Sequence, residues 1–81
     1  MRPYEIFYAP WCPFCQTVVI AYPYRKDILW RNTDHPGVLD ELIERGGKDQ
    51  VPCLIVKGET IIYETKEILK YLNEHPEGDV E

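Results

Sequence analysis

The fold is decided by the stretch YEIFYAPWCPFC, which occupies residues 4–15. Residues 4–8 alternate around apolar and aromatic side chains, a pattern that favours a β-strand. Pro10 breaks this strand, and Pro13 suits the first turn of a helix, where a missing N–H costs nothing. We therefore predict a strand that leads directly into a helix over 13–22, although the β-branched residues at 17–20 favour a strand by propensity.

Further elements follow outward along the chain. Strands are expected at 27–32, 51–56 and 60–63, with a turn at 57–59 that makes the last two a hairpin. A helix is expected over about 38–46, with a cap from Asp34 and an opening at Pro36. The glycine pair at 46–47 closes this helix. The last helix is expected to be capped by Thr65 and to end at His75.

The order β-α-β-α-β-β-α places the chain in the α/β class. A strand-helix-strand unit requires a right-handed crossover and a parallel pair of strands. The hairpin then adds antiparallel strands. The expected architecture is a four-stranded mixed sheet flanked by three helices, which form one domain over residues 1–76, with an acidic and disordered tail over 77–81.

Composition narrows the class of protein. The 81 residues include 9 Lys and Arg against 14 Asp and Glu, for a net charge of −5. This balance argues against a partner that is a nucleic acid or an anionic membrane, because both are bound through basic side chains. No apolar run approaches the ~20 residues that span a bilayer. Three cysteines do not fit the disulfide framework of a small secreted domain, so we expect a cytoplasmic protein. We also expect the protein to be a monomer.

A pair of thiols, Cys12 and Cys15, lies at the predicted start of the first helix. Residues three apart share a helix face, so their sulfurs are close enough to form a disulfide. The partial positive charge and free N–H groups at the helix start stabilise a thiolate at Cys12, which makes Cys12 the expected nucleophile. Cys15, one turn inside the helix, suits the resolving role. Trp11 and Phe14 offer a partner an apolar surface beside the pair.

A zinc half-site is the alternative interpretation of the same spacing. Structural zinc requires four ligands. The remaining candidates are Cys53, His35 and His75, which form no second tight pair. We therefore expect no metal. We interpret Cys53 as a buried core thiol, because strand alternation turns it away from the side that Pro52 faces.

The chain resembles glutaredoxins of the thioredoxin fold. The resemblance rests on Cys12-Pro13-Phe14-Cys15 together with Gln50-Val51-Pro52-Cys53, and it covers nearly the whole chain in the family's element order. It implies a cis peptide bond before Pro52, which turns the Val51 backbone toward Cys12. From the residues alone, a trans proline that begins a strand would be favoured.

A second resemblance concerns the start of the last helix. The segment Tyr63-Glu64-Thr65 is similar to the glutathione-binding helix start in the N-terminal domain of glutathione transferases. The two resemblances together imply a glutathione-binding site. Its expected residues are Phe14, Gln50, Val51, Pro52, Glu64 and Thr65.

Roles within this site follow from the same resemblance. Thr65 would receive the γ-glutamyl carboxylate, Glu64 would meet the amino group, and the Val51 backbone would pair with the cysteinyl part. The chain departs from glutaredoxins in lacking a lysine shortly before Cys12 and in carrying Phe14 where tyrosine is common. For the glycyl carboxylate, Arg25 or Lys48 would then have to substitute for the basic residues that often follow the motif.

The implied activity is that of an enzyme, a glutathione-dependent thiol–disulfide oxidoreductase. Its substrates would be protein disulfides or glutathionylated proteins, with glutathione as the reducing co-substrate. Two alternatives stay open: a redoxin recharged by thioredoxin reductase, and a non-catalytic module that binds glutathione or a partner. A dimer that shares an iron–sulfur cluster through Cys12 and glutathione is a further alternative, which Pro13 disfavours.

Overall fold

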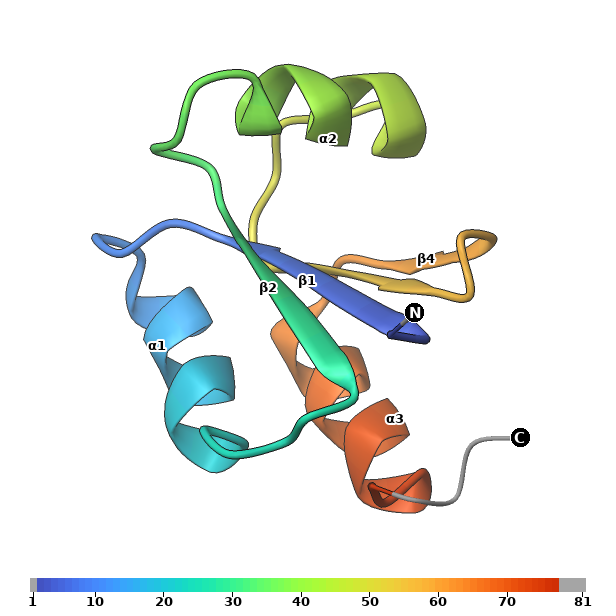
Figure 1. Ribbon diagram of the computed structural model, residues 1–81. Coiled ribbons are helices and arrows are strands. Elements are labelled where there is room, and N and C mark those ends of the chain that lie inside the picture. The colour runs from blue at the N-terminus through green and yellow to red at the C-terminus, as the bar shows by residue number, and fades with distance from the viewer. Residues whose placement is uncertain (1, 78–81) are drawn as a thin grey trace.

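The computed structural model describes residues 2–77 of the chain. Its elements follow the predicted order β-α-β-α-β-β-α (Figure 1). The predicted acidic tail lies outside the described residues, except for Glu77. The strands are β1 (Tyr4–Tyr8), β2 (Ile28–Asn32), β3 (Cys53–Val56) and β4 (Thr60–Ile62), and the helices are α1 (Pro13–Ala21), α2 (Val38–Gly46) and α3 (Thr65–Glu74).

The four strands form one mixed sheet in the order β2-β1-β3-β4. β1 and β2 are parallel, with Tyr4 opposite Ile28, and the other two pairs are antiparallel. Helices α1 and α3 lie on one face of the sheet and α2 lies on the other (Figure 1). β1 therefore occupies the middle of the sheet and delivers its C-terminal end to the start of α1.

Strand alternation divides the core between the two faces of the sheet. Ile6 and Leu54 pack toward α1 and α3, against Val18, Ile68 and Leu72. Their neighbours along the strands, Phe7, Cys53 and Ile55, pack with Val38 and Leu42 of α2. The three-layer architecture thus follows from apolar residues at successive positions in β1 and β3, which fill both faces.

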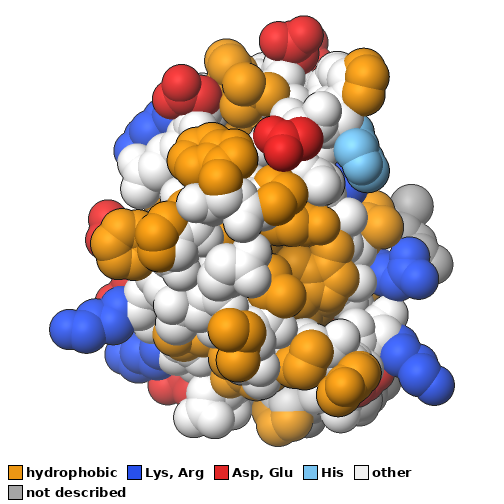
Figure 2. All heavy atoms as spheres, turned by 90° about the vertical axis from the view of Figure 1, so that its left-hand side faces the viewer, with side chains coloured by type: hydrophobic (Ala, Val, Ile, Leu, Met, Phe, Trp, Pro, Cys, Tyr) orange, Lys and Arg blue, Asp and Glu red, His pale blue; other side chains and the backbone are white. Residues whose placement is uncertain are grey.

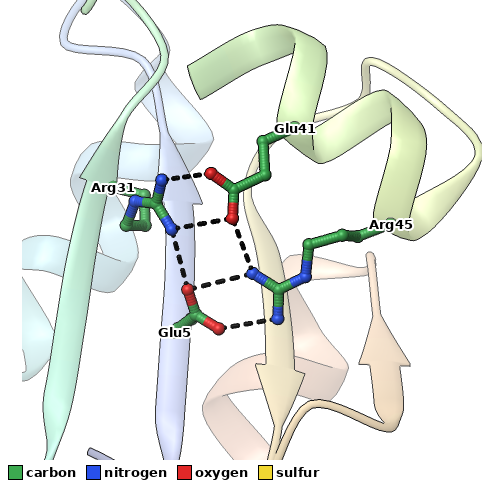
Figure 3. Close-up of polar contacts among 4 residues, drawn as sticks. All are labelled: Glu5, Arg31, Glu41 and Arg45. Atoms are coloured by element: carbon green, nitrogen blue, oxygen red, sulfur yellow. Dashed lines mark hydrogen bonds and ion pairs between the residues drawn. The ribbon is translucent and has the colours of Figure 1, made fainter. Parts of the chain in front are cut away.

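A network of four charged side chains ties α2 to the sheet (Figure 3). Arg31 of β2 and Arg45 of α2 each bind both Glu5 of β1 and Glu41 of α2, at distances of 2.5–3.1 Å. The Arg45 guanidinium holds the pKa of Glu5 below its usual range, mainly through its hydrogen bonds. Both guanidinium groups also lie over the Phe7 ring. The network therefore orients α2 over one face of the sheet.

The structure corrects three local predictions. The strand expected at 51–56 begins only at Cys53, because Pro52 has no N–H to donate to the ladder. The N-cap of α3 is Glu64, which makes no side-chain cap hydrogen bond, and Thr65 is the first residue of the helix. The N-cap of α2 is Gly37 rather than Asp34, since the chain enters this helix through a left-handed residue with φ of +83°.

Candidate functional site

The sulfur of Cys12 lies at the N-terminus of α1. Cys12 is the N-cap residue, with an extended backbone, and its Sγ accepts a hydrogen bond from the Cys15 backbone N–H at 3.3 Å. Its carbonyl accepts the N–H of Gln16, which begins the helical ladder. The sulfur therefore lies where the free N–H groups of the first helical turn point.

The two cysteines of the pair differ in environment. Cys12 is 5% exposed, whereas Cys15 is completely buried inside the first turn of α1. Burial, and then the hydrogen bond with Cys12, raise the pKa of Cys15 to about 12. At neutral pH Cys15 is therefore a protonated thiol beside the more accessible sulfur. This asymmetry suits a nucleophile at Cys12 and a resolving thiol at Cys15.

A cleft of about 240 Å³ lies between Phe14, the segment before β3 and the start of α3. The peptide bond between Val51 and Pro52 is cis, as the resemblance implied. The Val51 carbonyl oxygen lies 4.0 Å from Cys12 Sγ, so the cleft adjoins the thiol pair. Its lining residues are Phe14, Gln50, Val51, Pro52, Tyr63, Glu64, Thr65 and Lys66.

These lining residues include all six positions that the sequence suggested for glutathione. The structure adds Lys66, which sequence reasoning missed, and Tyr63, which belonged to the quoted motif but was given no role in the expected site. Both directly flank the Glu64-Thr65 pair, and that adjacency was the available signal. Lys48 also comes close, with Nζ 4.6 Å from the Tyr63 ring centroid. The cleft therefore offers amine groups for carboxylates and the Glu64 carboxylate for an ammonium group.

Arg25, considered above for the glycyl carboxylate, is not brought to this cleft. It is paired with Asp27 at 2.6 Å and donates to the carbonyls of Leu72 and His75. These carbonyls lie at the C-terminal end of α3, whereas the cleft lies at its N-terminal start. Lys48 remains the candidate for that carboxylate.

Cys53 is separated from the thiol pair by the sheet. It is fully buried among Phe7, Val38, Leu42 and Ile55 on the α2 side, as strand alternation predicted. Burial raises the pKa of the Cys53 thiol to about 11. Cys12 and Cys15 instead pack with Ala9 in a cluster of their own. Cys53 is therefore a core thiol and not a third member of the site.

The surface beside Cys12 is apolar and uncharged. Trp11 is 73% exposed and Phe14 is 67% exposed. Residues 6–24 contain no Asp, Glu, Lys, Arg or His. Figure 2 views the molecule from the α1 side and shows hydrophobic side chains over much of this face, with a few acidic side chains in its upper part and lysines and arginines mainly at its margins. This surface suits contact with another macromolecule.

Neither a metal cluster nor a membrane span is found within residues 2–77. No three or more His, Cys, Asp or Glu residues of this range come together in a way that could hold a metal ion. No helix in the range is both long enough and apolar enough to cross a membrane.

His75, named above as a candidate zinc ligand, ends α3 and stacks on the Tyr71 ring.

Comparisons with known proteins agree with this geometry. The parallel β1-α1-β2 unit, the antiparallel β3-β4 hairpin and the thiol pair at the start of α1 define a thioredoxin fold of the glutaredoxin type. The sequence match is to the family described as glutathione S-transferase, N-terminal domain, over residues 11–75. The chain belongs to this family. No curated protein sequence matches it.

Three of the solved structures with the same fold are glutaredoxins. A wheat glutaredoxin has a TM-score of 0.63 and 22% identity, and the match covers 95% of this chain and 74% of the other. A dithiolic glutaredoxin of Trypanosoma brucei brucei has a TM-score of 0.66 and 22% identity, and the match covers 96% of this chain and 81% of the other. Glutaredoxin C1 of Populus tremula x tremuloides, in its holo form, has a TM-score of 0.60 and 14% identity. This match covers 90% of this chain and 76% of the other. At these identities the likeness establishes the fold.

The environments of the three thiols predict selective alkylation. At pH 7, iodoacetamide should label Cys12 at least about 10-fold faster than Cys15 or Cys53. The other two thiols, with pKa values raised to about 12 and about 11, stay protonated and unlabelled as the pH rises to 9. Peptide mapping by mass spectrometry measures the three rates. Cys12 labelling no faster than that of the urea-unfolded chain would contradict an activated sulfur at the helix start.

Proposed function

We propose that this protein is a glutathione-dependent thiol–disulfide oxidoreductase that acts on protein disulfides or glutathionylated proteins. The observation that carries the proposal is the position of Cys12. Its sulfur caps α1, accepts the Cys15 N–H at 3.3 Å and adjoins a cleft with both acidic and basic side chains. The fold and family of the chain agree with such chemistry.

The first step is nucleophilic attack on a disulfide. The Cys12 thiolate attacks one sulfur of the substrate, the substrate S–S bond breaks, and the other sulfur leaves as a thiolate that takes a proton from water. Cys15 then loses its proton and attacks Cys12 Sγ. The Cys12–Cys15 disulfide forms and the substrate leaves as a second thiol, so two electrons have passed to the substrate.

Two molecules of glutathione return the protein to the dithiol state. The first attacks Cys12 Sγ, which leaves Cys12 bound to glutathione and frees Cys15. The second attacks the sulfur of the bound glutathione, releases glutathione disulfide and restores the Cys12 thiolate. With a glutathionylated substrate, Cys12 takes the glutathione directly, and this shorter route needs no Cys15.

The cleft is proposed to hold the glutathione whose sulfur reaches Cys12. Glutathione carries two carboxylates and one ammonium group. The N–H groups at the start of α3, with Thr65 and Lys66, suit the γ-glutamyl carboxylate, and Glu64 suits the ammonium group. Gln50 and Lys48 suit the glycyl carboxylate. The Val51 backbone then pairs with the cysteinyl unit beside Cys12.

A coupled assay of NADPH consumption tests the proposal with two regenerating systems. Wild type should reduce hydroxyethyl disulfide with glutathione and glutathione reductase. Cys15→Ser should retain turnover, because the mixed disulfide that glutathione forms with hydroxyethyl disulfide can enter the shorter route. Turnover supported by thioredoxin reductase, independent of glutathione and lost in Cys15→Ser, would instead identify a thioredoxin-like redoxin. Binding of glutathione without any turnover would identify a non-catalytic module.

A further inference from the structure

A second hollow begins where the glutathione cleft ends. This groove, of about 430 Å³, lies between β4 and α3 and shares Tyr63 and Glu64 with the cleft. From those two residues the groove continues toward the C-terminal end of α3. Figure 1 shows both β4 and α3. Its lining residues are Ile61, Ile62, Tyr63, Glu64, Glu67, Lys70, Tyr71 and Glu74.

The groove follows from the amphipathic pattern of α3 and from the position of β4. Glu67, Lys70 and Glu74 are spaced three or four residues apart and share one helix face. The opposite face of α3 buries Ile68 and Leu72 in the core. β4 is the edge strand of the sheet, and no strand within the described residues pairs with its outer side. The groove is therefore open along its length.

The chemistry of the groove does not match glutathione. Three glutamates and one lysine line it, so its charge is net negative, and isoleucine and tyrosine side chains supply apolar surface. Glutathione is itself an anion at neutral pH, and the cleft beside Cys12 already offers amines for its carboxylates. The groove is complementary to a ligand that carries cationic and apolar side chains together.

We propose that this groove binds an extended segment of the disulfide-bearing substrate protein, with lysine or arginine residues near the reacting cysteine. The proposal rests on the proposed function, since it assigns the polypeptide part of the same substrate. From Glu64 to Glu74, α3 rises about 15 Å, which matches about five extended residues. The segment must first cross the cleft between Cys12 and Glu64, which takes about three more extended residues, so the basic residues should lie about three to eight positions from the cysteine.

Peptides whose cysteine is joined by a disulfide to 2-mercaptoethanol provide the test, because they leave the cleft beside Cys12 free for the peptide chain. One peptide carries three lysines at positions three to eight residues from its cysteine, a second carries three glutamates there, and a third carries the lysines more than fifteen residues away. Wild type should release the first peptide thiol with kcat/KM about 10-fold above that of the other two. The third peptide separates binding in the groove from general attraction to a protein of net charge −5.

Charge reversal identifies the surface responsible. Glu67→Lys combined with Glu74→Lys should remove the preference for the lysine peptide. Glu44→Lys combined with Glu59→Lys makes the same change of charge at exposed positions outside the groove and should preserve it. Hydroxyethyl disulfide, too small to reach the groove, should be reduced at the wild-type rate by both double variants.

The outcomes separate the two proposals. Equal kcat/KM for the three peptides, with normal turnover of hydroxyethyl disulfide, overturns the groove assignment and leaves the proposed function standing. Loss of the preference in both double variants also overturns it. A groove covered by a second copy of the chain would appear as a dimer that only Glu67→Lys with Glu74→Lys dissociates, which likewise overturns it. Absence of any hydroxyethyl disulfide turnover removes the proposed function and this inference together.

Discussion

Cys12→Ser is expected to lower glutathione-dependent disulfide reduction about 1,000-fold or more, to the level of the uncatalysed exchange. A serine hydroxyl at this position stays protonated and cannot form a bond to sulfur in either route, so both the dithiol and the glutathionylated-substrate reactions stop. The coupled NADPH assay with hydroxyethyl disulfide and with a glutathionylated peptide measures both losses. The helix cap can persist, since serine also accepts the Cys15 N–H.

Two variants make this loss interpretable. Cys15→Ser should lose reduction of protein disulfides, which requires a second thiol, but should retain reduction of glutathionylated substrates. Cys53→Ala should keep both activities, because Cys53 lies on the α2 side of the sheet in a separate cluster. Equal losses in Cys12→Ser and Cys53→Ala would point to impaired folding. Full activity of Cys12→Ser would remove Cys12 from the mechanism.

Elements set by local patterns could be predicted from the sequence. The strand at Tyr4–Tyr8, the helix that begins at Pro13 and the closure of α2 at the glycine pair each depend on residues close together along the chain. Gly47 has φ of +86°, the left-handed conformation that a glycine at a helix end adopts most readily. The helix over the β-branched residues 17–20 shows tertiary packing overriding propensity, since Val18 lies in the core between α1 and α3.

The cleft was anticipated only in part, because its remaining walls depend on how distant segments meet. Gln50 to Pro52 and the Glu64-Thr65 pair carried recognisable motifs, and the structure brings both to Phe14. Lys66 carries no motif, and its exposure to the cleft depends on the exact start of α3. The predicted Thr65 cap was wrong by one position, which is the usual precision with which a helix end can be placed from sequence.

Long-range polar contacts were beyond sequence reasoning. Glu5 and Arg31 meet because their strands are parallel neighbours, and Arg45 joins them from a helix forty residues along the chain from Glu5. No local pattern distinguishes these side chains from ordinary surface charges. Arg25 illustrates the opposite case, since a basic residue considered for the glutathione site is instead held by Asp27 and by the end of α3.

Gly46→Ala is expected to destabilise the protein by about 1–3 kcal/mol, although helix propensity alone favours alanine by about 1 kcal/mol. Gly46 is the last residue of α2, and a methyl group there would overlap the Tyr63 hydroxyl. Urea unfolding measures the free energy. Because Tyr63 lines the glutathione cleft, its displacement should also raise the KM for glutathione in the coupled assay.

The destabilisation by Gly46→Ala should largely disappear when the Tyr63 hydroxyl is removed. That oxygen is buried, and its polar neighbours, the Cys53 thiol and the Lys48 backbone, do not reach good hydrogen-bond geometry, so Tyr63→Phe should be neutral or stabilising by about 1 kcal/mol. In the Tyr63→Phe background the nearest atom to the new methyl group is Cζ at 3.3 Å, a contact that small shifts can relieve. In that background Gly46→Ala should change the free energy of unfolding little, or should raise it through the better helix propensity of alanine in α2. An equal cost of Gly46→Ala in both backgrounds would show that the close approach of Gly46 and Tyr63 does not constrain this wall of the cleft.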